Sequence, residues 1–188
     1  MRLILASKSA TRKKALNQLG LKYEIIPSNF DEKSIRNDDP HKLVEELSQI
    51  KAKIVGDNED NSIVIAGDLF VVFEGKIYEK PKSEAEAFDM LKAFSGSTLH
   101  ILVGLAVYNS KIKKMYSVVK DYEVEFRELL DSEIQDYIYN YPVIHFAGGF
   151  NDDGLKLFAK DKKDIDSSLK CIPEKELIDF LRKNNFEI

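Results

Sequence analysis

Cysteine and histidine are scarce in this chain of 188 residues, which has one cysteine, three histidines and no tryptophan. The single cysteine, Cys171, excludes a disulfide bond within the chain and does not argue against a reducing cytoplasm. His41, His100 and His145 are scattered, and none has the HxxxH or CxxC spacing that is typical of zinc ligands. A zinc site is therefore not expected.

Long apolar runs and an excess of positive charge are also missing. No stretch approaches the roughly 20 apolar residues of a membrane span, and the opening MRLILAS is too short for a signal peptide. The formal net charge is −4, whereas a protein that binds nucleic acids without sequence preference usually has an excess of positive charge. We therefore expect a cytoplasmic globular protein that binds neither membranes nor nucleic acids.

Hydrophobic patterning and turn residues predict a mixed α/β fold without a regular βαβ alternation. Strands are predicted at residues 2–6, 23–27, 99–108 and 114–126, and once more after the loop HFAGGFNDDG. Residues 61–81 are predicted to form a buried strand and then a pair of strands. Helices are predicted at residues 9–20, 40–55, 83–96, 131–141 and 173–183. The strands 99–108 and 114–126 turn at Asn109–Ser110 and form an antiparallel hairpin.

A basic block follows the first predicted strand, in LASKSATRKKAL. Arg12 precedes the apolar residues of the first helix at spacings of three, four and seven, which places it on the inward face. The N-terminus of that helix offers free N–H groups and a positive dipole end. Ser7, Ser9 and Arg12 could therefore form a phosphate cradle. An ordinary helix cap with an internal salt bridge is the alternative.

Charged residues interrupt two other apolar patterns. Lys51 lies in the middle of the apolar stripe of the second helix, where a lysine either extends to water, the commoner outcome, or reaches a ligand cleft. Asp68 interrupts the strand IVIAGDLFVV, where an ionised carboxylate needs a cation, either a metal ion or a buried basic side chain. Glu32, in the acidic turn DEKS, could share that cation. The proline after Lys80 holds this lysine in an extended backbone.

Together these residues have the chemistry of a nucleoside triphosphate site. The candidate phosphate ligands are Ser7, Ser9, Arg12, Lys51 and Lys80, and the candidate metal ligands are Asp68 and Glu32. Hard oxygen ligands without histidine favour Mg²⁺ or Mn²⁺. Neither GxxxxGK[ST] nor GxGxxG occurs, which argues against a P-loop enzyme and a dinucleotide-binding fold.

At these residues the sequence resembles the Maf family, also called septum formation proteins. LILASKSATRKKAL is similar to the family pattern LASxSPRRxELL, and IVIAGDLFVVFEGKIYEKP to its GADTxV…G…KP segment. DEKS, KAKIV and DMLKAFSGST are similar to its acidic turn, its KA-x-A-V helix and its ML..LSG.T motif. The likeness runs along nearly the whole chain and is most specific over the first hundred residues.

The resemblance implies a single domain over residues 1–188 with the inosine-triphosphatase-like fold, a mixed sheet flanked by helices and two lobes around a central cleft. It implies a nucleoside triphosphate pyrophosphatase that releases the monophosphate and pyrophosphate with Mg²⁺ or Mn²⁺. Asp68 takes the position of the catalytic aspartate, treated as proton acceptor. The other charged active-site positions are Glu32, Lys51 and Lys80, and the phosphate-loop positions are Ser7 and Arg12.

Three departures from the family pattern concern the substrate. Ala10 and Thr11 replace a Pro-Arg pair, so one of two arginines is missing. Leu69 replaces the threonine after the catalytic aspartate, and Asp153 falls about where a glutamine belongs. The subgroup that prefers uridine and thymidine nucleotides carries that threonine and glutamine. We therefore expect a different base as the best substrate, one that carries an amino group or a modification.

A catalytically impaired nucleotide-binding regulator, linked to cell division, is the alternative from another functional class. The missing arginine favours it, and so does the glycine loop, which is HFAGGFNDDG here and DKAGAYGIQG in the family pattern. The retained charges at Glu32, Lys51, Asp68 and Lys80 oppose it, because inward charges are costly and an inactive protein has no use for them. The expected partner is a nucleoside triphosphate, and the sequence leaves a homodimer open.

Overall fold

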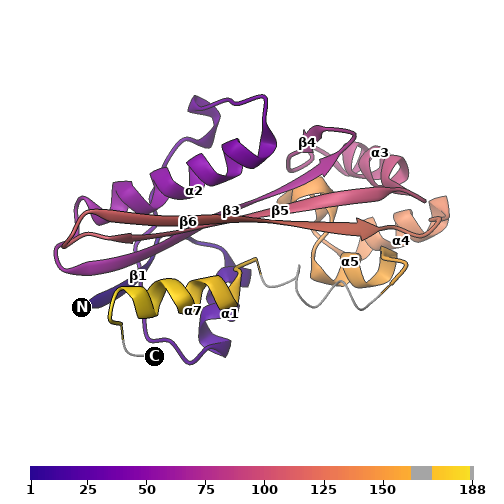
Figure 1. The fold of residues 1–188 in the computed structure, drawn as a ribbon. Coiled ribbons are helices and arrows are strands. Elements are labelled where there is room, and N and C mark those ends of the chain that lie inside the picture. The colour runs from indigo at the N-terminus through magenta and orange to yellow at the C-terminus, as the bar shows by residue number, and fades with distance from the viewer. Residues whose placement is uncertain (162–170, 187–188) are drawn as a thin grey trace. The chain divides into compact units, whose positions relative to one another are not determined.

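The computed structural model describes residues 1–161 and 171–186 and has a mixed α/β architecture (Figure 1). The chain divides into two compact units. Unit 1 comprises Met1–Leu69, Val103–Lys120 and Lys170–Ile188, and unit 2 comprises Phe70–Leu102 and Asp121–Leu169. Three long strands contribute residues to both units: β3 (Ser62–Phe73), β5 (Thr98–Asn109) and β6 (Lys114–Glu125).

The sheet of unit 1 contains two parallel pairings around its first strand. β1 (Arg2–Leu5) pairs in parallel with β2 (Glu24–Ile25) and with β3, where Leu5 lies opposite Ile65. The strand order is β2-β1-β3-β5-β6. Parallel strands are usually buried on both faces, and this arrangement requires helices on each side.

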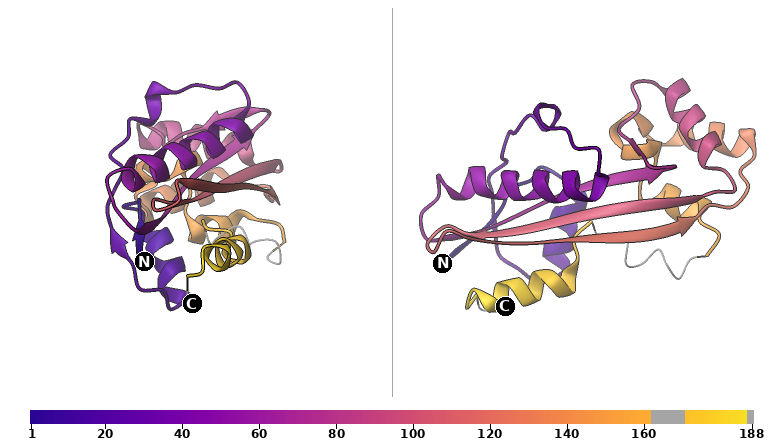
Figure 2. Two further views of the ribbon diagram at one scale, coloured as in Figure 1. Left: turned by 60° about the vertical axis from the view of Figure 1, so that its left-hand side comes forward. Right: turned by 45° about the horizontal axis from the view of Figure 1, so that its top comes forward.

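Helices cover both faces of this sheet in unit 1, as Figures 1 and 2 show. α2 (Pro40–Gly56) packs on one face, in a core that includes Ile4, Val64, Ala66 and Ala106. The opposite face packs against α1 (Ala10–Gln18) and α7 (Glu174–Lys183), in a core that includes Leu3, Leu5, Ile63, Ile65, Leu177 and Leu181. Successive residues of a strand point to opposite faces, so β1 and β3 each supply both cores.

The helix starts in unit 1 follow the capping residues that the sequence supplies. Ser9 Oγ accepts a hydrogen bond from the Arg12 N–H at 3.4 Å. Asp39 Oδ1 accepts from the N–H groups of His41 and Lys42, and Pro40 occupies the first position of α2. Both caps satisfy donors that have no partner within the helix, which fixes where α1 and α2 begin.

Unit 2 is built around an aromatic core. β4 (Lys76–Tyr78) pairs in antiparallel fashion with the end of β3, across the turn Glu74–Gly75. The helices of this unit are α3 (Glu84–Phe94), α4 (Asp131–Asn140) and α5 (Asp152–Phe158), with short 3₁₀ turns η2 (Val143–His145) and η3 (Ala147–Gly149). Phe94 makes edge contacts with four other rings, those of Phe73, Tyr78, Phe126 and Phe150.

The strand predicted after the loop HFAGGFNDDG is wrong where the structure describes it, because α5 occupies residues 152–158. Asn151 Oδ1 accepts from the N–H groups of Asp153 and Gly154 and starts this helix. Only an isolated bridge, Phe126 to Ala159, follows, and the remainder of the predicted strand region lies outside the described residues. β3 is also one continuous strand where a strand and a separate strand pair were predicted.

The mixed α/β class and the helices predicted near residues 9–20, 40–55, 83–96, 131–141 and 173–183 are confirmed. The single-domain assignment and the cleft between two lobes stay predictions. In the described part of the chain, no helix is both long enough and apolar enough to cross a membrane.

Candidate functional site

Ser7, Ser9 and Arg12 come together where β1 ends and α1 begins. The side chain of Arg12 donates from Nη1 to Ser7 Oγ at 3.2 Å, and its backbone N–H reaches Ser9 Oγ. Arg12 also lies against Gly67 of β3, because a Cβ atom built on that glycine would be 3.3 Å from Arg12 Nε. The inward orientation predicted for Arg12 is therefore present.

One donor of Arg12 is buried without an acceptor. Nε has no hydrogen-bond partner within the described residues, and no carboxylate there forms a salt bridge with this guanidinium. Of the cap and the internal salt bridge that together made up the alternative to a phosphate cradle, the serine cap is present, and the described residues contain no salt bridge of Arg12. A buried donor without an acceptor carries a desolvation cost, which a bound anion would relieve.

Lys51 joins two acidic residues from different elements of unit 1. Its Nζ lies 3.0 Å from Asp68 Oδ2 in β3 and 2.6 Å from Glu32 Oε1 in η1 (Glu32–Ser34). The side chains of Lys51 and Asp68 are only 8% and 11% exposed, whereas that of Glu32 is 54% exposed. Asp68 also accepts the Leu69 N–H at 2.9 Å. Asp68 thus has the cation that its buried position demands, and this cation is Lys51.

The commoner outcome for a lysine on an apolar stripe, extension to water, does not occur at Lys51. The described residues contain no group of three or more His, Cys, Asp or Glu side chains that could hold a metal ion. Glu32 and Asp68 nevertheless contact one nitrogen, so their carboxylates lie close together. Mg²⁺ often uses only one or two carboxylates together with substrate phosphates, and this pair fits that pattern.

Two glycines that the sequence patterns did not single out allow close packing here: Gly104 lies against α2, and Gly67 of β3 lies against β5. A Cβ atom on Gly104 of β5 would lie 2.5 Å from Ser48 Oγ and 2.7 Å from the Val44 carbonyl oxygen, both in α2. A Cβ atom on Gly67 would lie 2.7 Å from the Gly104 carbonyl oxygen. The backbone of α2 therefore approaches β5 directly, one turn before Lys51. A glycine inside an apolar strand, as in ILVGLAV, is the signal that could have indicated this contact.

Gly104→Ala should lower both stability and activity. The new methyl group would overlap Ser48 and Val44, so α2 must shift and Lys51 must move relative to Asp68. Overpacking of this kind costs about 1–3 kcal/mol. Urea denaturation would measure the loss of stability, and an initial-rate assay would measure the loss of activity. A Gly104→Ala variant as stable and as active as the parent would show that the close approach is not needed.

Lys80 and Asp153 belong to unit 2. Lys80 is exposed and follows β4, and the preceding carbonyl group, that of Glu79, accepts the Gly148 N–H at 3.1 Å. Asp153 is exposed in the first turn of α5, a few residues beyond Gly148. The structure thus connects the Lys80 segment to the glycine loop that precedes Asp153. The roles assigned to Lys80, Asp153 and Leu69 at the substrate stay predictions.

Comparison with known proteins identifies the family of this chain. The family model described as Maf-like protein matches residues 2–184. The chain belongs to the Maf-like family. A 7-methyl-GTP pyrophosphatase of Idiomarina loihiensis is 35% identical over 184 residues, which cover 96% of this chain and 93% of that protein. The resemblance drawn from the sequence motifs is confirmed.

Two further relatives indicate the range of names within this Maf-like family. A 7-methyl-GTP pyrophosphatase of Aliivibrio fischeri is 31% identical and covers 100% of this chain and 98% of its own length. A dTTP/UTP pyrophosphatase of Clostridium perfringens is 38% identical over 157 residues, or 82% of each chain. A solved nucleoside-triphosphatase / dITP/XTP pyrophosphatase from Mycobacterium abscessus covers 69% of this chain and 76% of its own at 13% identity. Its TM-score of 0.43 is too low to carry a conclusion.

Proposed function

We propose that this Maf-like protein is a nucleoside triphosphate pyrophosphatase, which converts a nucleoside triphosphate and water into the monophosphate and pyrophosphate. The observation that carries the proposal is the buried Lys51–Asp68 pair, joined by the half-exposed Glu32, with Arg12 packed against Gly67, the residue before Asp68. The relatives from Idiomarina loihiensis and Clostridium perfringens support it, because both are named nucleotide pyrophosphatases.

Different residues of this chain are proposed to carry out different parts of the reaction. The oxygen of a water molecule attacks the α-phosphorus, the bond from that phosphorus to the bridging oxygen breaks, and pyrophosphate leaves. Asp68 positions the water and accepts its proton. Arg12 Nε–H and the Lys51 ammonium group donate to phosphate oxygens, where negative charge develops. Lys80 is proposed to act in the same way.

Glu32 and Asp68 would hold a divalent cation, which we propose to be Mg²⁺ or Mn²⁺. Such an ion would neutralise part of the phosphate charge and would lower the pKa of a water molecule bound to it. The half-exposed Glu32 can turn toward an ion brought with the substrate, since it has less packing to lose than Asp68. Cellular nucleotides are the partners of such an enzyme, so we also propose a cytoplasmic location and no nucleic-acid or membrane partner.

The base that we propose is 7-methylguanine. Leu69 offers neither a hydrogen-bond donor nor an acceptor through its side chain, and an ionised Asp153 offers only acceptors. A carboxylate cannot pair with a uracil carbonyl group, but it can accept from the ring N–H and amino group of guanine. Methylation at N7 adds positive charge to that ring and strengthens such a contact. The 7-methyl-GTP pyrophosphatases among the relatives support this choice.

Pyrophosphate release from a panel of nucleotides tests the proposal. With Mg²⁺ or Mn²⁺ we expect 7-methyl-GTP to exceed UTP and dTTP in kcat/KM by at least roughly tenfold, since each mismatched hydrogen bond costs about 1–3 kcal/mol, or roughly 5- to 150-fold. The double variant Leu69→Thr, Asp153→Gln should shift the ratio toward UTP.

Three outcomes would contradict parts of this proposal. A tenfold preference for UTP and dTTP would remove Leu69 and Asp153 as specificity residues and leave the pyrophosphatase assignment intact. Nucleotide binding without any pyrophosphate release, under all metal conditions, would favour the regulator instead. Full activity in excess chelator would contradict the metal-binding role of Glu32 and Asp68.

A further inference from the structure

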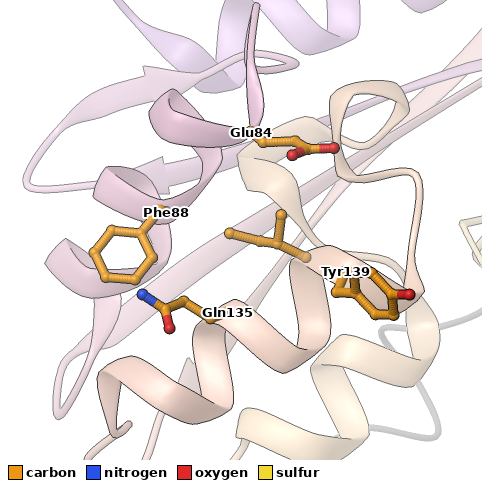
Figure 3. Close-up of a pocket in the computed structure, with 5 residues that line it drawn as sticks. Glu84, Phe88, Gln135 and Tyr139 are labelled. Atoms are coloured by element: carbon orange, nitrogen blue, oxygen red, sulfur yellow. The ribbon is translucent and has the colours of Figure 1, made fainter.

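A groove of about 510 Å³ lies between α3 and α4 in unit 2 (Figure 3). It is lined by Glu84, Phe88, Gln135, Ile138 and Tyr139. The rings of Phe88 and Tyr139 lie on opposite sides of this groove, and the residue Tyr139 is 90% exposed. A large aromatic side chain so open to water at the edge of a groove is typical of a contact surface.

The two helices that form the groove carry mostly acidic side chains. Their acids are Glu84, Glu86, Asp89, Asp131, Glu133 and Asp136, against a single basic residue, Lys92. Lys92 is bound by Asp131, and Glu133 is bound by Arg127. Glu84, Asp89 and Asp136 have no salt bridge in the part of the chain that the structure describes. Glu84 is the charged residue of the groove lining, so the partner expected here carries a basic side chain and an apolar group for the aromatic walls.

The turn between β5 and β6, in unit 1, has that chemistry. It contains Lys111, Ile112 and Lys113, directly before β6 begins at Lys114, and the residue Ile112 is 58% exposed. Asn109 Oδ1 accepts from the N–H groups of Lys111 and Ile112, at 3.1 and 3.3 Å.

The first residues of the turn are also anchored, through Asn109, to the end of α7. The Asn109 amide donates to Asn184 Oδ1 at 2.7 Å, in a buried contact with the end of α7. An exposed isoleucine on a turn held in one conformation loses little entropy when it binds. The entropic cost of binding a partner through this turn is therefore expected to be small.

We propose that the β5–β6 turn of one copy of this chain docks into the α3–α4 groove of a second copy. Ile112 would enter between Phe88 and Tyr139, and the flanking lysines would lie beside the unpaired acids, Glu84 among them. Each copy carries one turn and one groove, so the contact joins two unlike surfaces of identical chains. A turn in a groove buries little area, which predicts a weak association that depends on charge and salt.

Charge reversal with mixing tests this contact directly. Sedimentation equilibrium at low salt should show self-association of the parent protein, weakened in 0.5 M salt, on the order of the ionic strength at which surface charges are screened. Lys113→Glu and Glu84→Lys should each raise the dissociation constant roughly tenfold or more. A mixture of the two variants should associate more tightly than either variant alone, because the unchanged turn of one copy then meets the unchanged groove of the other, and the reversed turn meets the reversed groove.

Matched controls separate this contact from a general effect of charge. Lys22→Glu makes the same charge change as Lys113→Glu at an exposed residue of unit 1 outside the turn, and should leave association unchanged. Tyr139→Ser should weaken association without any change in charge. A monomer at all concentrations would overturn the proposal. So would association that neither reversal affects, or a mixture no tighter than the single variants. Since both reversals lie outside the catalytic cluster, pyrophosphate release should persist in either case.

Discussion

Asp68→Asn should lower kcat for pyrophosphate release by roughly 100-fold or more, while the protein stays folded. Asparagine keeps the size of the side chain and one acceptor oxygen, which can keep the hydrogen bond from the Leu69 N–H or the one from Lys51, but not both. Lys51 also keeps Glu32 as its charged partner. The variant loses the negative charge that accepts the proton and contributes to metal binding, together with one hydrogen-bond acceptor. Initial rates at saturating 7-methyl-GTP, together with a thermal melt, would measure both effects.

Asp57→Asn is a matched control for this variant. Asp57 follows α2 and forms an ion pair with Lys53 of that helix, as Asp68 does with Lys51 of the same helix. The side chain of Asp57, however, is 44% exposed. The hydrogen bond from Lys53 holds the pKa of Asp57 below its usual range, as expected of an ion pair. We expect this variant to keep full activity. Activity retained after Asp68→Asn, or an equal loss after Asp57→Asn, would contradict the role of Asp68.

Lys51→Met should abolish most of the activity and also destabilise the protein. Its position on an apolar stripe, taken alone, predicts the opposite for stability, because methionine would pack well there. The structure reverses this expectation: Lys51 is the cation between Glu32 and the buried Asp68. Removing one partner of a buried ion pair typically costs about 3–5 kcal/mol, since the remaining charge has no compensation. Loss of a cation that stabilises phosphate charge typically costs roughly 100-fold or more in rate.

Two further variants show whether the destabilisation comes from an unpaired charge. Lys51→Met combined with Asp68→Asn should recover most of the stability, as measured by urea denaturation, and none of the activity. Lys53 lies two residues further along α2 and its side chain is exposed, so Lys53→Met should change neither stability nor activity. If the single variant Lys51→Met were as stable as the parent, Lys51 would not be the structural partner of Asp68. Full activity in that single variant would remove Lys51 from the site altogether.

The charged residues of the site could be found from sequence because each violates a local pattern. Arg12 and Lys51 lie on apolar helix faces, and Asp68 interrupts an apolar strand, so each is visible within a few neighbouring residues. Their pairing is not visible in this way. Whether Asp68 takes a metal ion or Lys51 depends on how α2 lies against β3, and this contact joins positions 17 residues apart.

Two other differences between prediction and structure have different causes, one tertiary and one local. Gly104 acts through contacts with α2, whose residues lie far earlier in the chain. In the segment after the glycine loop, Asn151 starts a helix where a strand was predicted, because its side chain captures two backbone donors at once. The short length of α5, Asp152–Phe158, leaves little periodic signal for a helix.

The close approach of α2 to the sheet at Gly104, and of β5 to β3 at Gly67, has a consequence for how this protein tolerates sequence change. The closest contacts are made by backbone atoms and one hydroxyl group, so a change of side-chain rotamer alone cannot admit a larger residue. Neighbouring core positions such as Val103 and Leu105 can exchange one aliphatic residue for another with modest loss. In a saturation library we would therefore find these neighbours variable and the two glycines fixed, although neither glycine has a side chain to offer a substrate.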